Sequence, residues 1–139
     1  MDRRFETALE PVASSAAAAR RTVQRVLTEW GLRHLEEPVV LLTTELVSNG
    51  VRHARTELVL SMHFDGSCLR VSLFDEAIGM PAMTKQDDVA NRGWGLRLVD
   101  TVASNWGTTV EPTGKTVWFE ISALDDLVQS RRPETSGLS

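Results

Sequence analysis

Residues 57–75 read ELVLSMHFDGSCLRVSLFD, and this stretch decides the fold that we expect. Two runs within it, 57–64 and 68–75, alternate apolar with polar side chains, as strands with one buried face do. Asp65 and Gly66 lie between the runs, and an Asp-Gly pair in that position is a strong signal for a tight turn. The stretch therefore predicts an antiparallel hairpin.

On the N-terminal side, one strand and one helix are expected first. Apolar residues alternate along 4–9 and a proline follows, which is typical of a short edge strand. Ser14 or Ser15 then caps a helix that continues through Trp30. Gly31 ends this helix, because glycine adopts the left-handed conformation found just after many helices.

A second helix is expected from 37 to about 54, with a proline in its first turn, where no backbone donor is needed. Its apolar residues form one broad stripe. Glu45, Asn49 and Arg52 run along one flank of that stripe, spaced i, i+4 and i+7. An acid and an amide thus project side by side at the margin of the core, where ordinary packing requires neither.

On the C-terminal side, residues 79–92 lack sustained periodicity and are expected to form a loop, which is long enough to suggest a function. A third helix is expected from 94 to about 107, followed by strands at 108–112 and 115–122. Helices gathered on one face of a mixed, mostly antiparallel sheet form an α+β fold, a two-layer α/β sandwich.

The composition of the 139-residue chain predicts one domain, residues 1–123, and a partly disordered tail, residues 124–139. The formal net charge of −4 argues against direct nucleic-acid binding. No segment approaches the ~18 apolar residues of a membrane span. The single cysteine cannot form an internal disulfide. We therefore expect a cytoplasmic protein that binds small molecules or other proteins.

Three further motifs carry chemistry. Asp75 ends the second strand of the hairpin and is followed by an irregular segment that contains Gly79. Gly93 and Gly95 come directly before the third helix, where glycines let a phosphate approach the backbone N–H groups of a helix N-terminus. A Gly-Lys-Thr sequence that ends at Thr116 lies in the late hairpin.

The order of these motifs resembles that of the GHKL, or histidine kinase-like, ATPase superfamily. That order is E-x-x-x-N on a helix, Asp and then Gly after a strand, Gly-x-Gly-Leu at a helix start, and a late Gly-x-Thr. The stretches ELVSNGVRHA and GLRLVDTVASNWG resemble in particular the anti-sigma-factor serine/threonine kinases common in actinomycetes. The resemblance covers almost all of residues 5–122. It implies a Bergerat-type ATP-binding fold with ATP and Mg²⁺ as cofactors.

The resemblance also implies a role for individual residues. Asn49 would ligate Mg²⁺, and Glu45 would act as the general base. Asp75 would accept a hydrogen bond from the adenine amino group, and Thr116 would support the adenine end. The full set of implied nucleotide-binding residues is Asn49, Asp75, Gly79, Gly93, Gly95, Leu96 and Thr116.

Two positions depart from the family pattern. The segment after Asp75 is usually D-x-G-x-G, and here Ala77 stands at its middle glycine. If the backbone there needs a positive φ, a Cβ costs ~1–2 kcal/mol, whereas at negative φ alanine is harmless. Asn91 stands at the first glycine of the usual G-x-G-x-G. That change is milder, because asparagine tolerates the left-handed region.

Three functions follow from the resemblance. The first is an enzyme that uses Mg-ATP to phosphorylate a serine or threonine on a small antagonist protein. Its partners would be a sigma factor, an anti-sigma-antagonist protein or both. The resemblance also implies a homodimer. The second is a non-catalytic module that binds ATP or has degenerated, and sequesters a partner. The third, a detached sensor-kinase domain, is the weakest, because the helix at 14–30 contains no phosphoacceptor histidine.

Overall fold

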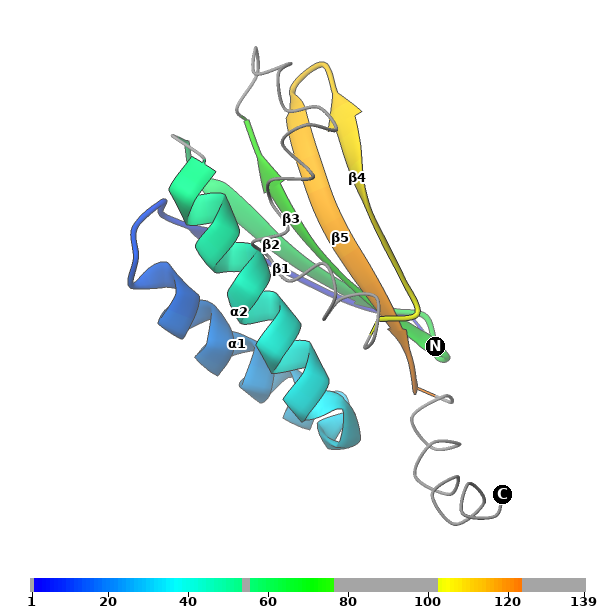
Figure 1. The fold of residues 1–139 in the computed structure, drawn as a ribbon. Helices are drawn as coiled ribbons and strands as arrows, with labels where there is room; N and C mark the ends of the chain where they lie inside the picture. The colour runs from blue at the N-terminus through cyan, green and yellow to red at the C-terminus, as the bar shows by residue number, and fades with distance from the viewer. Residues whose placement is uncertain (1, 54–55, 77–102, 124–139) are drawn as a thin grey trace, which may run out of the picture.

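The computed structural model describes residues 2–53, 56–76 and 103–123. Two α-helices, one short 3-10 helix and five strands make up this part of the chain. In chain order they are β1 (Arg3–Leu9), α1 (Ser15–Glu29), η1 (Arg33–Leu35), α2 (Glu36–His53), β2 (Leu58–Phe64), β3 (Cys68–Asp75), β4 (Asn105–Glu111) and β5 (Gly114–Ser122). Figure 1 shows α1 and α2 as one layer against one face of the sheet, as expected for an α+β two-layer sandwich.

The five strands form one sheet in the order β1-β2-β3-β5-β4, and every neighbouring pair is antiparallel. β1 is an edge strand, as its short alternating pattern predicts. β5, which comes last along the chain, lies between β3 and β4. The late hairpin therefore joins the early one through the pairing of β5 with β3.

The turn between β2 and β3 follows the expected Asp-Gly chemistry. The Asp65 carboxylate accepts hydrogen bonds from the backbone N–H groups of Ser67 at 2.9 Å and Cys68 at 2.8 Å. These bonds, the one from Ser67 first, hold the pKa of Asp65 below its ordinary value of 3.8. Gly66 has a φ of 104°, which favours glycine.

The end of α1 is also as predicted. Gly31 has a φ of 74°. Its N–H donates to the Thr28 carbonyl at 3.2 Å, and the Leu32 N–H donates to the Leu27 carbonyl at 2.8 Å. This pair of bonds is the Schellman arrangement. It turns the chain sharply, so that α2 runs back along α1.

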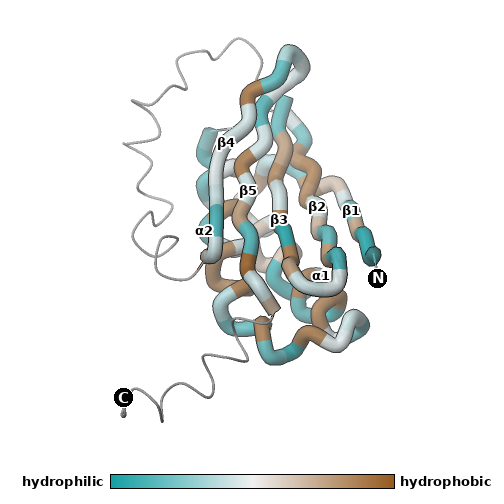
Figure 2. Tube along the Cα trace, turned by 90° about the vertical axis from the view of Figure 1, so that its right-hand side faces the viewer, coloured by the Kyte–Doolittle hydropathy of each residue, from teal (hydrophilic) through white to brown (hydrophobic). Residues whose placement is uncertain are grey.

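The core lies between the helices and one face of the sheet. Period-two alternation directs one set of strand residues toward the helices, and Figure 2 shows brown stretches alternating with paler ones along β3 and β5. The buried residues of α2 and the strands include Val39, Leu42, Leu46, Val47, Leu58, Leu60, Met62, Leu69, Val71, Leu73, Phe119 and Ile121.

One prediction from the sequence is wrong. The third helix cannot extend to residue 107, because Trp106 lies in β4 opposite Phe119 of β5. Cross-strand pairing there overrides the helical periodicity of the preceding residues. Trp118 lies on the outer face, since its neighbour Phe119 occupies the buried face. The rest of the predicted third helix, the loop at 79–92 and the tail at 124–139 lie outside the described residues.

Candidate functional site

Gly50, in the C-terminal half of α2, packs closely against the sheet. A Cβ added there would lie 2.6 Å from the Leu73 Cδ2 atom and 3.7 Å from the Leu58 Cδ2 atom. Glycine therefore lets the helix pack against the end of β3, two residues before Asp75. Asn49, adjacent to Gly50, belongs to the same end of the two-layer structure.

Asp75 is the last residue of β3 and is only 5% exposed. It continues the alternation of Leu73 and Val71, which face the helices. A carboxylate is seldom buried at a strand end unless a hydrogen-bonding function requires it. Its cross-strand neighbours are Leu58 of β2 and Lys115 of β5.

The start of β5 closes tightly over this end of β3. A Cβ added at Gly114 would overlap the backbone carbonyl oxygen of Asp75 and would lie 2.8 Å from the Phe74 ring. Only glycine therefore fits between the two strands at this point. The glycine of the late Gly-Lys-Thr motif thus has a steric role at the backbone of Asp75.

The register between β3 and β5 sets the faces of Asp75 and Thr116, which the family resemblance assigns to the adenine end of the nucleotide. Thr116 is opposite Phe74, whereas Lys115 is opposite Asp75. Because successive side chains alternate between the faces of a strand, Thr116 projects from the other face of the sheet than Asp75. Lys115 is the residue of the motif that shares the face of Asp75.

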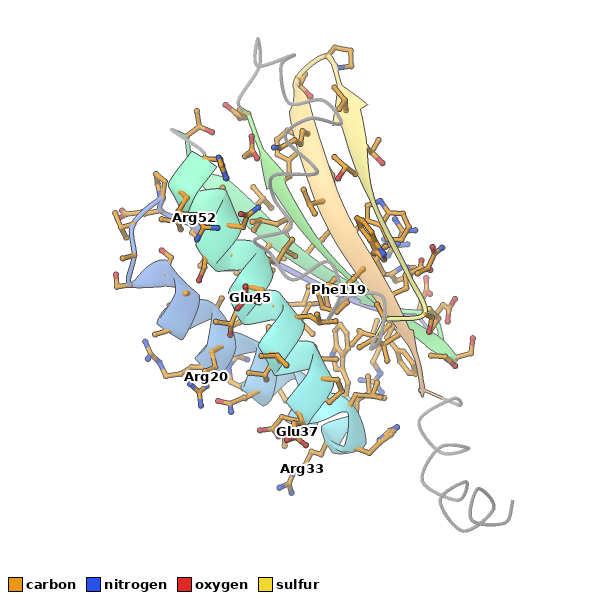
Figure 3. All side chains as sticks on the ribbon, in the orientation of Figure 1. Arg20, Arg33, Glu37, Glu45, Arg52 and Phe119 are labelled. Carbon is orange, nitrogen blue, oxygen red and sulfur yellow. The ribbon has the colours of Figure 1, made fainter. Side chains whose placement is uncertain are left out.

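The polar flank of α2 has the predicted order. Glu45 and Asn49 are half-buried, and Arg52 is exposed. The Arg52 guanidinium donates from Nη2 to the Asn49 Oδ1 atom at 2.8 Å. In Figure 3, Glu45 lies near the middle of α2 and Arg52 near its C-terminal end. The i, i+3 spacing of Asn49 and Arg52 is the signal from which this bond could have been predicted.

The residues present fit a magnesium–nucleotide ligand. Asn49 Oδ1 is an accessible hard oxygen that already accepts a charge-assisted hydrogen bond. Within the described ranges, no group of three or more His, Cys, Asp or Glu residues could hold a metal by itself. A magnesium ion at Asn49 would therefore take most of its ligands from phosphate and water, which is its usual preference.

The remaining predicted site residues, Gly79, Gly93, Gly95 and Leu96, lie outside the described residues, as do Ala77 and Asn91. The part of the site that the structure describes is thus the polar flank of α2, the end of β3 and the start of β5. Over the same described ranges, no helix is long and apolar enough to cross a membrane.

Comparisons with known proteins agree with the fold. Residues 9–121 match the family model of the histidine kinase-like ATPase domain. Among solved structures, the chain is similar to the histidine kinase domain of a blue-light activated histidine kinase from Erythrobacter litoralis, with a TM-score of 0.54 and 18% sequence identity. The match covers 82% of this chain but only 62% of that chain, and at this identity it shows a shared fold. The comparison with curated proteins gave no match.

Proposed function

The chain belongs to the histidine kinase-like ATPase domain family, and from this premise we propose that it is a regulator that transfers phosphate from Mg-ATP to a serine or threonine of a small partner protein. The observation that carries the proposal is the joint presence of Glu45 and Asn49 on one flank of α2, together with a buried carboxylate, Asp75, at the end of β3. A domain that only bound nucleotide would not need an acid at the position of Glu45.

Asp75 would select the base. A carboxylate accepts the hydrogen bond that the adenine amino group donates, and it repels the carbonyl oxygen that guanine presents at the same position. The burial of Asp75 strengthens this discrimination, because water cannot easily replace the missing hydrogen bond. Gly114 supports the arrangement by allowing β5 to close against the Asp75 backbone.

Asn49 would hold the phosphate end of the nucleotide. Its Oδ1 atom would ligate Mg²⁺, and for this the Arg52 guanidinium has to leave that oxygen. An arginine released next to a triphosphate gains phosphate oxygens as partners. A magnesium ion bound there would supply positive charge that neutralises the phosphates.

Glu45 would act as the general base. It lies one helical turn before Asn49, so both side chains lie on the same side of α2. From this position its carboxylate would accept the proton of a hydroxyl group that attacks the terminal phosphate. The resemblance of the ELVSNGVRHA stretch to anti-sigma-factor kinases supports an anti-sigma-antagonist protein as the source of that hydroxyl, and a sigma factor as a second partner.

Calorimetry with Mg-ATP and Mg-GTP tests the nucleotide site. We expect the wild-type chain to bind Mg-ATP, and we expect Asn49→Ala and Asp75→Asn each to weaken binding at least about tenfold. Asn105→Ala, which changes an exposed asparagine of β4, is the matched control. Unchanged affinity in both site variants, or equal affinity for the two nucleotides, would contradict the assignment.

Phosphate transfer is tested separately, on an array of serine- and threonine-containing peptides with γ-labelled ATP. We expect label on a subset of peptides with the wild-type chain and at least about a hundredfold less with Glu45→Gln, while Mg-ATP binding is retained. Glu57→Gln changes an exposed glutamate outside the site and serves as the control. Label that persists in Glu45→Gln would exclude Glu45 as the base.

A second function, partner sequestration without transfer, is favoured by two observations. Ala77 stands where the family has a glycine, and Thr116 projects from the other face of the sheet than Asp75. Tight Mg-ATP binding without label on any peptide would support this second function over the first.

A further inference from the structure

Lys115 is the residue of the Gly-Lys-Thr motif that lies beside the buried carboxylate of the site. It is the direct cross-strand neighbour of Asp75, and Figure 1 shows the start of β5 next to the end of β3. Residues opposite each other on antiparallel strands share a face, with Cβ atoms about 4.5–5.5 Å apart. The side chains of Lys115 and Asp75 therefore start side by side, on the face of the sheet that carries the helices.

One row of side chains crosses this face at the level of Asp75. In the order of the strands β2, β3, β5 and β4, the row consists of Leu58, Asp75, Lys115 and Val110. Leu58 is fully buried and Asp75 is 5% exposed, whereas Val110 is 69% exposed. Lys115 is half-buried and lies between Asp75 and Val110. The row thus opens toward solvent from β2 to β4, and a ligand that reaches Asp75 from the open side contacts Lys115.

The backbone around Lys115 is held close to Asp75. A Cβ added at the preceding residue, Gly114, would overlap the Asp75 carbonyl oxygen, so the two strands have little room to move at this point. The Lys115 side chain, in contrast, is long and can turn. The described residues provide no ion-pair partner for it. The N–H donors of its ammonium group are therefore available to a ligand.

The acid and the base of this row match the edge of an adenine ring. Adenine carries its amino group, which donates hydrogen bonds, next to the ring nitrogen N1, which accepts one. In the proposed function Asp75 accepts from the amino group, and a lysine beside it is suited to donate to N1. Guanine has the reverse order, because its carbonyl oxygen accepts and its N1–H donates. Guanine would therefore be opposed by both side chains.

We propose that Lys115 determines the base specificity of the nucleotide site together with Asp75, by donating a hydrogen bond from Nζ to N1 of adenine. This contact rests on the proposed function, because it requires that Asp75 binds the adenine amino group. It adds a second residue of opposite charge to the recognition of the base. It also assigns that role to the lysine of the Gly-Lys-Thr motif, since Thr116 projects from the other face of the sheet.

Calorimetry with Mg-ATP and Mg-1-deaza-ATP tests the contact. In 1-deaza-ATP a C–H group replaces N1 and the amino group is kept. We expect 1-deaza-ATP to bind the wild-type chain at least about tenfold more weakly than ATP, because Lys115 loses its acceptor. Lys115→Met keeps a long side chain without the donors. In this variant we expect the two nucleotides to bind within about twofold of each other.

The same four Kd values separate this contact from other roles of Lys115. A lysine that only oriented Asp75, or that bound phosphate, would affect ATP and 1-deaza-ATP equally when it is replaced. The ratio of the two Kd values would then be the same in Lys115→Met as in the wild-type chain, and this result would overturn the proposal. Equal affinity of the wild-type chain for ATP and 1-deaza-ATP would also overturn it, without the need for any variant.

Two controls address ring chemistry and net charge. Mg-7-deaza-ATP lacks a nitrogen on the other side of the ring, and we expect the wild-type chain to bind it within about twofold of Mg-ATP. Arg21→Met removes an exposed cation of α1, and we expect it to keep the wild-type preference for ATP over 1-deaza-ATP. A loss with 7-deaza-ATP as large as that with 1-deaza-ATP, or a lost preference in Arg21→Met, would contradict the role of Lys115. Circular dichroism verifies that both variants are folded.

Failure of this contact is distinguishable from failure of the proposed function. If the wild-type chain does not bind Mg-ATP, or if Asp75→Asn binds it equally well, the proposed function fails and the contact of Lys115 fails with it. If Mg-ATP binds and Asp75→Asn weakens the binding, but 1-deaza-ATP binds as well as ATP, only the role of Lys115 is overturned.

Discussion

Thr43 is the residue at which the packing of α2 leaves a polar group unsatisfied. Its side chain is fully buried, and among the described residues its Oγ1 atom is the buried side-chain atom without a hydrogen-bond partner. A buried hydroxyl without a partner costs about 1–3 kcal/mol. Thr43→Val keeps the shape of the side chain and removes the hydroxyl, so we expect the free energy of unfolding to rise by about 1 kcal/mol in urea denaturation. A decrease would contradict this account of the site.

Asp65 makes the stability of the β2–β3 turn depend on pH. Its pKa in the folded chain is lowered by hydrogen bonds from backbone N–H groups. Its contribution to stability is therefore complete above the unfolded value near 3.8 and is lost as the pH falls through the lower folded value. We expect Asp65→Ala to lower the urea midpoint at pH 5, and the difference from the wild-type chain to shrink toward pH 3. A difference that is constant with pH would contradict the prediction.

Gly114 links the stability of the sheet to the nucleotide site. In Gly114→Ala the new Cβ meets the Asp75 backbone, so β5 has to move away from β3. We expect a loss of about 2–3 kcal/mol in the free energy of unfolding and weaker Mg-ATP binding. The control is Gly31→Ala, where φ is 74° and nothing lies within 4 Å. That variant is expected to cost ~1–2 kcal/mol without changing nucleotide affinity.

The sequence was informative about single residues where a motif combined with periodicity. Glu45 and Asn49 were expected on one flank of a helix and Asp75 at the end of a strand, and the structure has them there. The face that Thr116 occupies could not be predicted, because it depends on the register between β3 and β5. That register becomes apparent only when strands far apart in the sequence are paired.

At the scale of elements, the contact between α2 and β3 depends on Gly50. Alanine is favoured over glycine in a helix by up to ~1 kcal/mol, but here its Cβ would lie 2.6 Å from the Leu73 Cδ2 atom. We expect Gly50→Ala to be destabilising in the wild-type chain and stabilising in a Leu73→Ala background, where that atom is absent. A double-mutant cycle in urea measures the coupling, and effects that add within ~0.5 kcal/mol would contradict the contact.

Turns that need a particular residue type were predicted well from the sequence. The start of β4, which depends on pairing with β5, was not. The turn after α1 contains Gly31 and the β2–β3 turn contains Gly66, because both positions have a positive φ, and Asp65 accepts hydrogen bonds from the backbone of the second turn. The start of β4 at Asn105 carries no such signal. Residues 105–107 continue an amphipathic pattern typical of a helix and are a strand through their pairing with β5, whereas the rest of β4 was predicted as a strand from the sequence.

At the scale of the whole molecule, Ala123 ties the end of β5 to the β2–β3 turn. Its N–H donates to the Ser67 carbonyl at 2.9 Å, and its side chain is 8% exposed. We expect a chain shortened to residues 1–123 to melt within ~2 °C of the full chain. A chain that ends at Glu120 loses the buried Ile121 as well, and we expect it to lose about 3 kcal/mol or more. A large drop in Tm for the first variant would contradict the domain boundary at residue 123.

The place of β5 in the sheet affects how the protein is made. Of the five described strands, the one that lies between β3 and β4 is synthesised last. The roughly 50 residues between Asp75 and Ser122 take several seconds to translate at ~5–20 residues per second. During that time the nascent chain can already pair β1, β2 and β3, which leaves the backbone of β3 open along one side. Such an open strand edge can pair with another chain, so we expect β3 to be the edge most exposed to aggregation until β5 is in place.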